Sequence, residues 1–334
     1  MAKFAEQANK AAKNLATTTT GYTNAALIYY QQGDSDAEVA KKAEITLKAA
    51  NAAFGASAKE MSEYLTAVWN SYQVGADELE RYVDIMAALG AKTATSLEEI
   101  ATSMQKVAAT SNAVGVSMEQ VSSIISTVSS VTRESAESIG TSFKTIFARM
   151  GDLKLGETLE DGIQLGQVSS QLAKIGVNIL DVNGQMRDMG TVIEELMAKW
   201  GQLSAAEQVA TAQVVAGKRQ YTQLLALMEN REMYQKNMQI AENSAGFTNK
   251  QAEIYKESWA AASKEVRASL EGMWGQLIDD QTFIKATKGI AGFVSEISRL
   301  IQNIGGFKSA LTLAGAALMN LYSPQVATKI DSMA

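Results

Sequence analysis

Two glycine-bearing stretches come closest to the spacing of a phosphate-binding loop. In residues 151–158 the two glycines have the required separation, but Glu157 occupies the place of the lysine that must contact the phosphates. A carboxylate at that position would repel a phosphate group. Around Lys218, Ala212 replaces the first glycine and Arg219 replaces the hydroxyl residue. We therefore expect neither stretch to bind a nucleotide.

Carboxylates occur in two patterns that carry chemistry in other proteins. Asp181 and Asn183 precede Gly184 as in a calcium loop, yet the glycine comes too early for the EF-hand turn, and a simple chain reversal explains the pattern. Glu-Ser pairs occur in lytic transglycosylases, whose single catalytic glutamate needs a sugar-binding cleft around it. Pairs this short arise by chance in a chain rich in both residues, and they stand at positions 134–135, 137–138 and 257–258.

The chain contains no cysteine and no histidine among its 334 residues. Cys-His zinc sites, thiol nucleophiles, disulfide bonds and Ser-His-Asp triads are therefore excluded. A formal net charge of -6 argues against a nucleic-acid partner, because such a surface must be basic to neutralise phosphates. We interpret the chain as a structural and interaction protein and not an enzyme, with no catalytic residue, no cofactor and no metal.

Helical structure is indicated throughout by the near absence of proline. Pro324 is the only proline in the chain, and helix interiors reject this residue most strongly. Helix starts are marked by a serine or threonine followed three positions later by Glu or Gln. In this capping box the two side chains satisfy free backbone N–H groups. The predicted starts are at Ser35, Ser57, Ser96, Ser117, Thr191 and Ser204.

Glycines stand where the preceding helices should end, as expected if a helix closes on a left-handed residue. We expect such stops at Gly33, Gly55, Gly75, Gly90, Gly115 and Gly201. Because the intervals between them are short, successive helices should fold back on one another as antiparallel neighbours. A longer helix is predicted from Asn249 to about Asp279.

The predicted fold is all-α, mainly antiparallel helical hairpins or a bundle, with one small β-hairpin near residues 177–187. β-Branched residues alternate there up to Asn183 and Gly184, and an Asn-Gly pair favours a type I′ turn, which needs two positive φ angles. These two residues are the predicted structural turn. We expect three parts, namely N-terminal helices in residues 1–33, a helical core with the hairpin in 34–245, and a long helix with amphipathic and apolar helices in 246–334.

Two apolar features leave alternatives open. The 15 methionines lie mostly on apolar helical stripes, where they would fill the core, but a promiscuous binding surface is the alternative. A further stripe near the C-terminus has the spacing of an amphipathic helix and is a candidate membrane or oligomer face. Its members are Ile290, Phe293, Val294, Ile297, Leu300, Ile301 and Ile304.

One segment stands out among several blocks that follow one another along the chain, namely Gly-Thr-Ser-Phe-Lys-Thr-Ile-Phe-Ala-Arg at residues 140–149. The other blocks are residues 22–33, 96–100, 115–117, 176–177, 183–184, 187–188, 199–200 and 216–220. In this order, the blocks resemble the core region of phage tail tape-measure proteins, and the resemblance covers about residues 20–280.

This resemblance implies a virion structural protein that templates the tail tube, determines tail length and is released during DNA ejection. It implies a homo-oligomer, trimer or hexamer, in the lumen of the tail, after a stage in the host cytoplasm during assembly. The implied partners are tail tube and tail-tip proteins and tail assembly chaperones, with the host membrane and cell envelope as a further partner at infection. Family members are usually longer, so we expect a piece of a longer protein, and no catalytic position is carried over.

The alternative interpretation is a membrane-active helical protein, such as a toxin or a pore-forming segment. The amphipathic stripe in residues 290–304 is followed by an apolar segment of small residues at 305–322, and both together could associate with lipid. A liposome-binding assay on residues 281–334 would separate the two interpretations.

Overall fold

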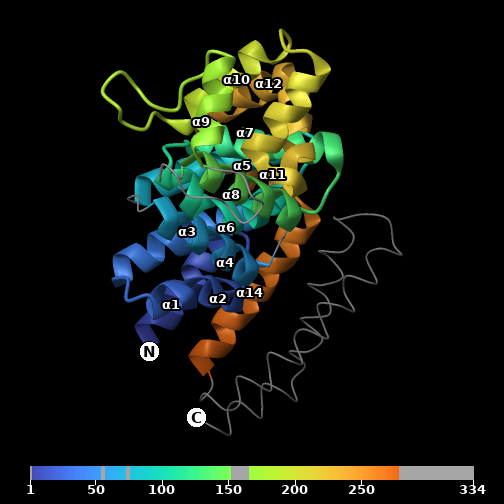
Figure 1. The fold of residues 1–334 in the computed structure, drawn as a ribbon. Coiled ribbons are helices and arrows are strands. Elements are labelled where there is room, and N and C mark those ends of the chain that lie inside the picture. The colour runs from blue at the N-terminus through green and yellow to red at the C-terminus, as the bar shows by residue number, and fades with distance from the viewer. Residues whose placement is uncertain (1, 54–56, 73–75, 152–164, 278–334) are drawn as a thin grey trace, which may run out of the picture. The chain divides into compact units, whose positions relative to one another are not determined.

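The computed structural model describes residues 2–53, 57–72, 76–151 and 165–277. The described residues form fourteen helices, so the prediction of an all-α fold is confirmed. The helices, labelled in Figure 1, are α1 (Ala2–Asn14), α2 (Thr19–Gln31), α3 (Asp36–Ala52), α4 (Ala58–Tyr72), α5 (Ala76–Lys92), α6 (Leu97–Ala113), α7 (Met118–Thr132), α8 (Ala136–Gly151), α9 (Leu165–Lys174), α10 (Met189–Trp200), α11 (Ala205–Glu229), α12 (Arg231–Glu242), α13 (Phe247–Lys256) and α14 (Trp259–Leu277).

The chain divides into two compact units. The larger unit is Gly21–Tyr255, and the described part of the smaller one consists of the residues up to Thr20 and those from Lys256 to the end of α14. The three-part division predicted from the sequence stays a prediction.

In the smaller unit, α1 packs against α14, helices from opposite ends of the sequence. Asn9 of α1 donates a hydrogen bond to the backbone carbonyl of Ala268 in α14 (2.7 Å). The buried carboxylate of Glu271, also in α14, accepts the backbone N–H of Thr19 (2.8 Å). Asn9 therefore connects α1 to α14, and Glu271 connects α14 to the first residue of α2.

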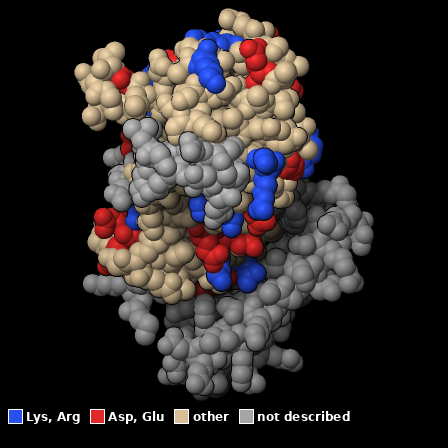
Figure 2. Space-filling view, in the orientation of Figure 1, with Lys and Arg blue, Asp and Glu red and all other residues tan. Residues whose placement is uncertain are grey.

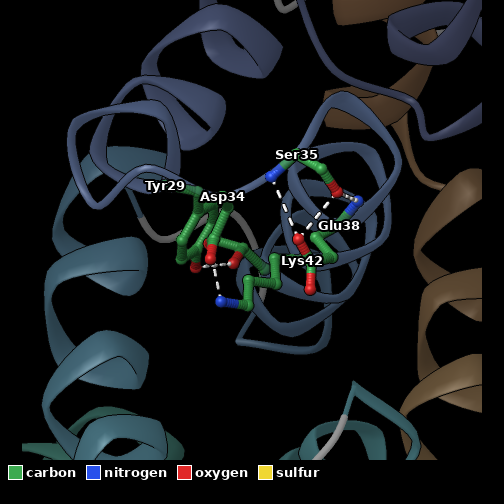
Figure 3. Close-up of polar contacts among 6 residues, drawn as sticks. Tyr29, Asp34, Ser35, Glu38 and Lys42 are labelled. Carbon is green, nitrogen blue, oxygen red and sulfur yellow. Dashed lines mark hydrogen bonds and ion pairs between the residues drawn. The ribbon is translucent and has the colours of Figure 1, made fainter.

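Four of the predicted capping boxes are formed in the larger unit. At each, the serine side chain accepts a backbone N–H three residues later, and the Glu or Gln side chain accepts the N–H of the serine. The four serines are Ser35, Ser96, Ser117 and Ser204. Figure 3 shows the first box, where the N–H of Ser35 donates to Glu38 at 3.0 Å. At Ser57 the serine hydroxyl accepts the N–H of Glu60 (3.4 Å).

In the turn between α2 and α3, one helix ends at a left-handed glycine and the next begins at a capping box. Gly33 has a φ of 87°, and its N–H donates to the carbonyl of Tyr30, while the N–H of Asp34 donates to the carbonyl of Tyr29. These paired bonds are those of a Schellman motif, which needs a left-handed residue at this position. Lys42 then pairs with Asp34 (2.6 Å) and lies over the ring of Tyr29 (Figure 3).

The predicted start of α10 at Thr191 is wrong. The helix begins at Met189, because the carboxylate of Asp188 accepts the N–H of Thr191 (3.0 Å) and so acts as the cap. Glu194, the predicted partner in the box, instead accepts hydrogen bonds from two other helices. Asp188, three residues before Thr191, is therefore the N-cap of α10 in place of Thr191.

Three further boundaries differ from the prediction. Gly90 lies inside α5, where a Cβ would be 2.5 Å from the backbone nitrogen of the first residue of α6, so close packing accounts for this glycine. Gly201 follows α10 as predicted, but with a right-handed φ of -67°. The helix predicted over residues 249–279 is divided into α13 and α14, because the Ser258 side chain accepts the N–H of Ala261 (3.2 Å) and starts a new helix.

The predicted β-hairpin near residues 177–187 is not a pair of strands. Within the described ranges, regular pairing there is limited to one isolated antiparallel bridge between Leu180 and Met186. Gly184 has a positive φ of 75° but Asn183 does not, so the turn is not type I′. A neighbouring aspartate selects a different turn, as described below.

The most extensive helix packing in the larger unit joins helices two apart in the sequence. α6 packs more extensively against α8 and α4 than against its sequence neighbours α5 and α7, although these consecutive helices are also in contact. Gly140 of α8 allows this approach, because a Cβ there would lie 2.4 Å from the backbone oxygen of Ser103 in α6. The hydroxyl of Ser103 donates to the carbonyl of Ala136 across the same contact (2.7 Å). The glycine of the block at residues 140–149 is therefore a packing residue.

α7 lies in the interior of the larger unit, in contact with α5, α6, α8, α11 and α12. Ile124, Ile125 and Val128 are wholly buried, and so are polar side chains between them. Asn237 of α12 donates a buried hydrogen bond to the hydroxyl of Thr127 (3.0 Å). Small serines allow the surrounding helices to approach α7 closely. The hydroxyls of three of them have no hydrogen-bond partner among the described residues, namely Ser122, Ser123 and Ser126.

Candidate interaction surface

Residues 178–187 form a loop that projects from the larger unit between α9 and α10 (Figure 1). Asp181 organises its tip. The carboxylate accepts the backbone N–H groups of Asn183 and Gln185, both at 2.8 Å, and the Asp181 carbonyl accepts the N–H of Gly184 (3.1 Å). With Gly184 in the left-handed region, this is the pattern of a type I turn followed by a glycine bulge.

Two cationic side chains hold the base of the loop. Arg187 donates to the carbonyl of Asn178 (2.8 Å), and its guanidinium pairs with Glu195 of α10. Lys199, one turn further along α10, donates to the carbonyl of Gly176 at the end of α9 (2.7 Å). Hydrogen bonding from Arg187 lowers the pKa of the Glu195 carboxyl below its usual value. The loop is therefore attached to α10 at two points.

The tip of this loop presents an apolar side chain to solvent. Val182 has a relative exposure of 101%, so it touches nothing else in its own chain that would shield it. Met186, further along the same loop, is partly exposed as well. A single exposed apolar residue is common on protein surfaces, but this one stands on a loop whose backbone is already fixed. A fixed loop loses little conformational entropy on binding.

Two adjoining grooves run along α10, the end of α11 and α12. Their volumes are about 510 and 790 Å³, and they share Met197, Arg231 and Gln235. Methionines contribute much of the apolar lining, with Met197 and Met228 buried and Met233 partly exposed. The charged residues of the lining are mostly acidic, with Arg231 as the cation beside the carboxylates of Glu194, Glu229, Glu232 and Glu242. Met197 and Met228 are buried as core residues as well as lining the groove, so a binding role for these methionines stays a prediction.

A polar network centred on Glu194 fixes one side of these grooves. The Glu194 carboxylate accepts the hydroxyl of Tyr234 in α12 (2.8 Å) and the amide of Gln120 in α7 (3.0 Å). Gly190, one turn earlier in α10, makes room for Gln120, because a Cβ there would lie only 1.9 Å from the amide oxygen. Burial raises the pKa of Tyr234, so its hydroxyl stays protonated and can donate. α10 and α12 are thereby held against α7.

α11 is broken at Gly217, whose φ and ψ are 79° and 164°. Arg149 of α8 satisfies the carbonyls at the break, donating to Val215 (3.2 Å) and Val214 (3.1 Å). Arg149 ends the block at residues 140–149, and Gly217 lies in the block at residues 216–220. The hydrogen bonds of Arg149 therefore bring these two blocks together. Lys218, considered above as a phosphate-loop lysine, lies just beyond the break and is exposed.

The structure places the predicted site residues as follows. Asn183 and Gly184 lie at the tip of the projecting loop. Of residues 151–158 only Gly151 is described, and residues 305–322 fall outside the described ranges. The predicted membrane or oligomer face also lies outside them, at Ile290, Phe293, Val294, Ile297, Leu300, Ile301 and Ile304.

Across the described residues, no group of three or more acidic side chains gathers where it could hold a metal ion. Among the helices that the structure describes, none has both the length and the apolar character needed to cross a membrane. Figure 2 shows acidic and basic side chains interspersed over the face in view.

Neither the role of Asp181 in the loop nor the groove was predicted from the sequence. A signal for Asp181 was present, because an aspartate two residues before an N–H that it can accept favours an Asx-turn. The exposure of Val182 follows from that turn. Nothing local marks the groove, since its lining comes from three helices and depends on how α10 and α12 pack against α7.

A family model described as phage-related minor tail protein matches residues 5–217, nearly two thirds of the 334 residues. The match includes the contact between α6 and α8, the projecting loop and α11 up to its break. No solved structure matches the chain.

Proposed function

This chain belongs to the family of phage-related minor tail proteins, and on that premise we propose that it is the folded assembly domain of a tail tape-measure protein. Its role is structural. In this proposal the protein templates the tail tube, sets its length and is released during DNA ejection. It occupies the tail lumen as a homo-oligomer, packs against tail tube and tail-tip proteins after contact with assembly chaperones, and uses no catalysis, cofactor or metal.

The observation that carries this proposal is the folded-back arrangement of helices around α7. A ruler made of continuous helix extends by ~1.5 Å for each residue. In Gly21–Tyr255 the helices are short, restart at capped serines and pack on α7 through five partners. Such a body does not lengthen in proportion to its sequence. This supports a role in assembly for this part of the protein, with length measured elsewhere.

The blocks that resemble the tape-measure family support the same role. Gly140 allows α8 to approach α6, and Arg149 holds the break in α11. Gly33 and Gly115 end helices in left-handed conformations. Each of these residues builds the body, and none is placed to react with a substrate, which favours a function carried out by packing.

The experiment that tests the proposal is an in-frame deletion of residues 96–135 in the phage that encodes the chain. This removes α6 and α7, so we expect tail assembly to be abolished or disordered in electron micrographs of mutant lysates. Intact tails that are shorter by ~1.5 Å per deleted residue would contradict the proposal, because they would show that this part measures length.

A point variant provides a milder version of the same test. Gly140→Val should also prevent ordered assembly, because its side chain would overlap the backbone of Ser103. The neighbouring variant Thr141→Ser, at an exposed position, is the matched control and should give tails of normal length. Normal tails from both variants would contradict the proposed assembly role.

A further inference from the structure

We propose that the two adjoining grooves along α10 and α12 bind an amphipathic helix of a partner protein, one that carries lysine or arginine beside an apolar stripe. This inference goes beyond the proposed function, which leaves the chemistry of every partner open, and it does not rest on it. The shape of the lining, its charge and an indole N–H without an acceptor support it.

The grooves have the length of a short helix. One face of α12 contributes to the lining from the first residue of that helix to its last, at spacings of three and four positions. Its members are Arg231, Tyr234, Gln235, Met238, Gln239 and Glu242. From position 231 to position 242 there are 11 steps of ~1.5 Å, or ~16 Å and about three helical turns. An elongated groove beside a helix face is the kind of surface on which an amphipathic helix docks.

The charge of the lining favours a cationic partner. Glu229, Glu232 and Glu242 are exposed, and no ion pair of the described residues involves them. Arg231 is the only cation among the residues that line the two grooves. These carboxylates would repel a nucleic acid or an anionic lipid surface, both of which are bound through basic residues. Lysine or arginine on a partner helix would complement them, and such complementarity selects partners.

Apolar side chains accompany these carboxylates. Met233 is 37% exposed, and Met238 is half-buried, so both present surface to a ligand in the grooves. Methionine is flexible and adapts to apolar side chains of different shapes. Packing an apolar stripe against the two methionines would remove apolar surface from water. The partner helix therefore needs an apolar stripe as well as cations.

Trp200 contributes a hydrogen-bond donor that the chain itself leaves unused. The residue lines the larger groove with an exposure of 3%, and its indole N–H has no acceptor among the described residues. A buried donor without a partner costs free energy, which a ligand recovers by supplying an acceptor. The last carbonyls of a helix have no partner within that helix and would serve as acceptors. The unused N–H is therefore an observation, independent of the charge, that points to a ligand.

Calorimetric titration of the full chain tests the required charge of the partner. The probe is a synthetic amphipathic peptide of about four helical turns, with leucine on one face and lysine on the other. Its counterpart has glutamate in place of each lysine. We expect saturable binding of the lysine peptide and no binding of the glutamate peptide. Failure of the lysine peptide to bind, or equal binding of the two peptides, would overturn the inference.

Variants of the carboxylates locate the binding site. The triple variant Glu229→Gln, Glu232→Gln and Glu242→Gln should weaken binding of the lysine peptide about tenfold, because several exposed ion pairs of modest strength are lost together. The matched control removes the same charge at exposed positions outside the lining, by Glu60→Gln, Glu63→Gln and Glu98→Gln, and should weaken binding less than about twofold. Equal weakening by the two triple variants would show attraction to the net charge alone and would overturn the inference.

Nuclear magnetic resonance of the indole N–H groups gives a measurement on the natural chain. Trp200→Phe identifies the Trp200 signal by its absence. The lysine peptide should shift this signal. The Trp69 indole N–H is also buried without an acceptor among the described residues, but it belongs to α4 and not to the lining, so its signal should not move. An unmoved Trp200 signal at saturating peptide would overturn the inference. The deletion of residues 96–135 tests the proposed function separately, and its outcome does not depend on this result.

Discussion

α7 and the projecting loop are held in place by opposite means. α7 is surrounded by five helices, and most of its side chains from Met118 to Ser129 are buried. The loop at residues 178–187 is mostly exposed, and its shape comes from hydrogen bonds made by Asp181, Arg187 and the backbone. Side-chain volume therefore determines the stability of α7, whereas backbone conformation and a few polar bonds determine that of the loop. Variants of the two regions should differ accordingly.

The largest expected effect comes from removing apolar volume in α7. Ile124→Ala should lower the free energy of unfolding by about 2–5 kcal/mol, because it leaves a cavity at a fully buried position. Val182→Ala removes apolar volume from the loop and should change stability by less than about 0.5 kcal/mol. Urea unfolding of both variants measures the difference. Equal effects would mean that the contrast between the two regions is wrong.

The next effect concerns the backbone of the loop. Gly184→Val should lower the free energy of unfolding, or of local opening, by about 1–3 kcal/mol, because a β-branched residue resists the φ of 75° found there. A Cβ at this position meets no neighbouring atom, so the cost is conformational and not a clash. Gly184→Asn is the control and should cost less, because asparagine tolerates the left-handed region. An unchanged melting temperature for the valine variant would refute the assigned turn.

A smaller effect of opposite sign is expected inside α7. Ser126→Ala should raise the free energy of unfolding by about 1 kcal/mol, because it removes a buried hydroxyl that has no partner among the described residues. At the adjacent position, Thr127→Val should be destabilising, since it leaves the buried amide of Asn237 without its acceptor. Thermal melts of the pair test this. If Ser126→Ala proves destabilising, the serine hydroxyl contributes more to α7 than the structure shows.

The smallest effect is a loosening of the loop at acid pH. The pKa of Glu195 is lower in the folded state, so its ion pair with Arg187 contributes stability above the ordinary carboxyl pKa and loses it as the pH falls through the lowered value. The pair is partly exposed, so its contribution should be below about 1 kcal/mol. The protection factor of the N–H of Arg187, which donates to Ile179, should fall between pH 6 and pH 3 once the slowing of intrinsic exchange is divided out. Glu195→Gln should lack this pH dependence, and a variant that retained it would argue against the ion pair.

The sequence by itself predicted those features that depend on hydrogen bonds within a few residues. The starts at Ser35, Ser96 and Ser117 and the left-handed stops at Gly33 and Gly115 are all of this kind. Each is completed by groups no more than five positions apart, so neighbouring residues suffice to specify it. The all-α class follows from the same short-range rules.

The tertiary structure alone decided which helices meet and therefore where the candidate surface lies. Gly90 was predicted to end a helix, but it lies inside α5 and allows α6 to approach closely. Gly217 breaks α11, and Arg149 of α8 donates to the backbone carbonyl of Val215 beside the break. The groove exists because Glu194 accepts hydrogen bonds from α7 and α12 at once. A glycine or a glutamate looks the same in the sequence whichever of these contacts it makes. Only the packing of distant helices supplies the partner, because contacts between residues far apart in the chain have no local signature.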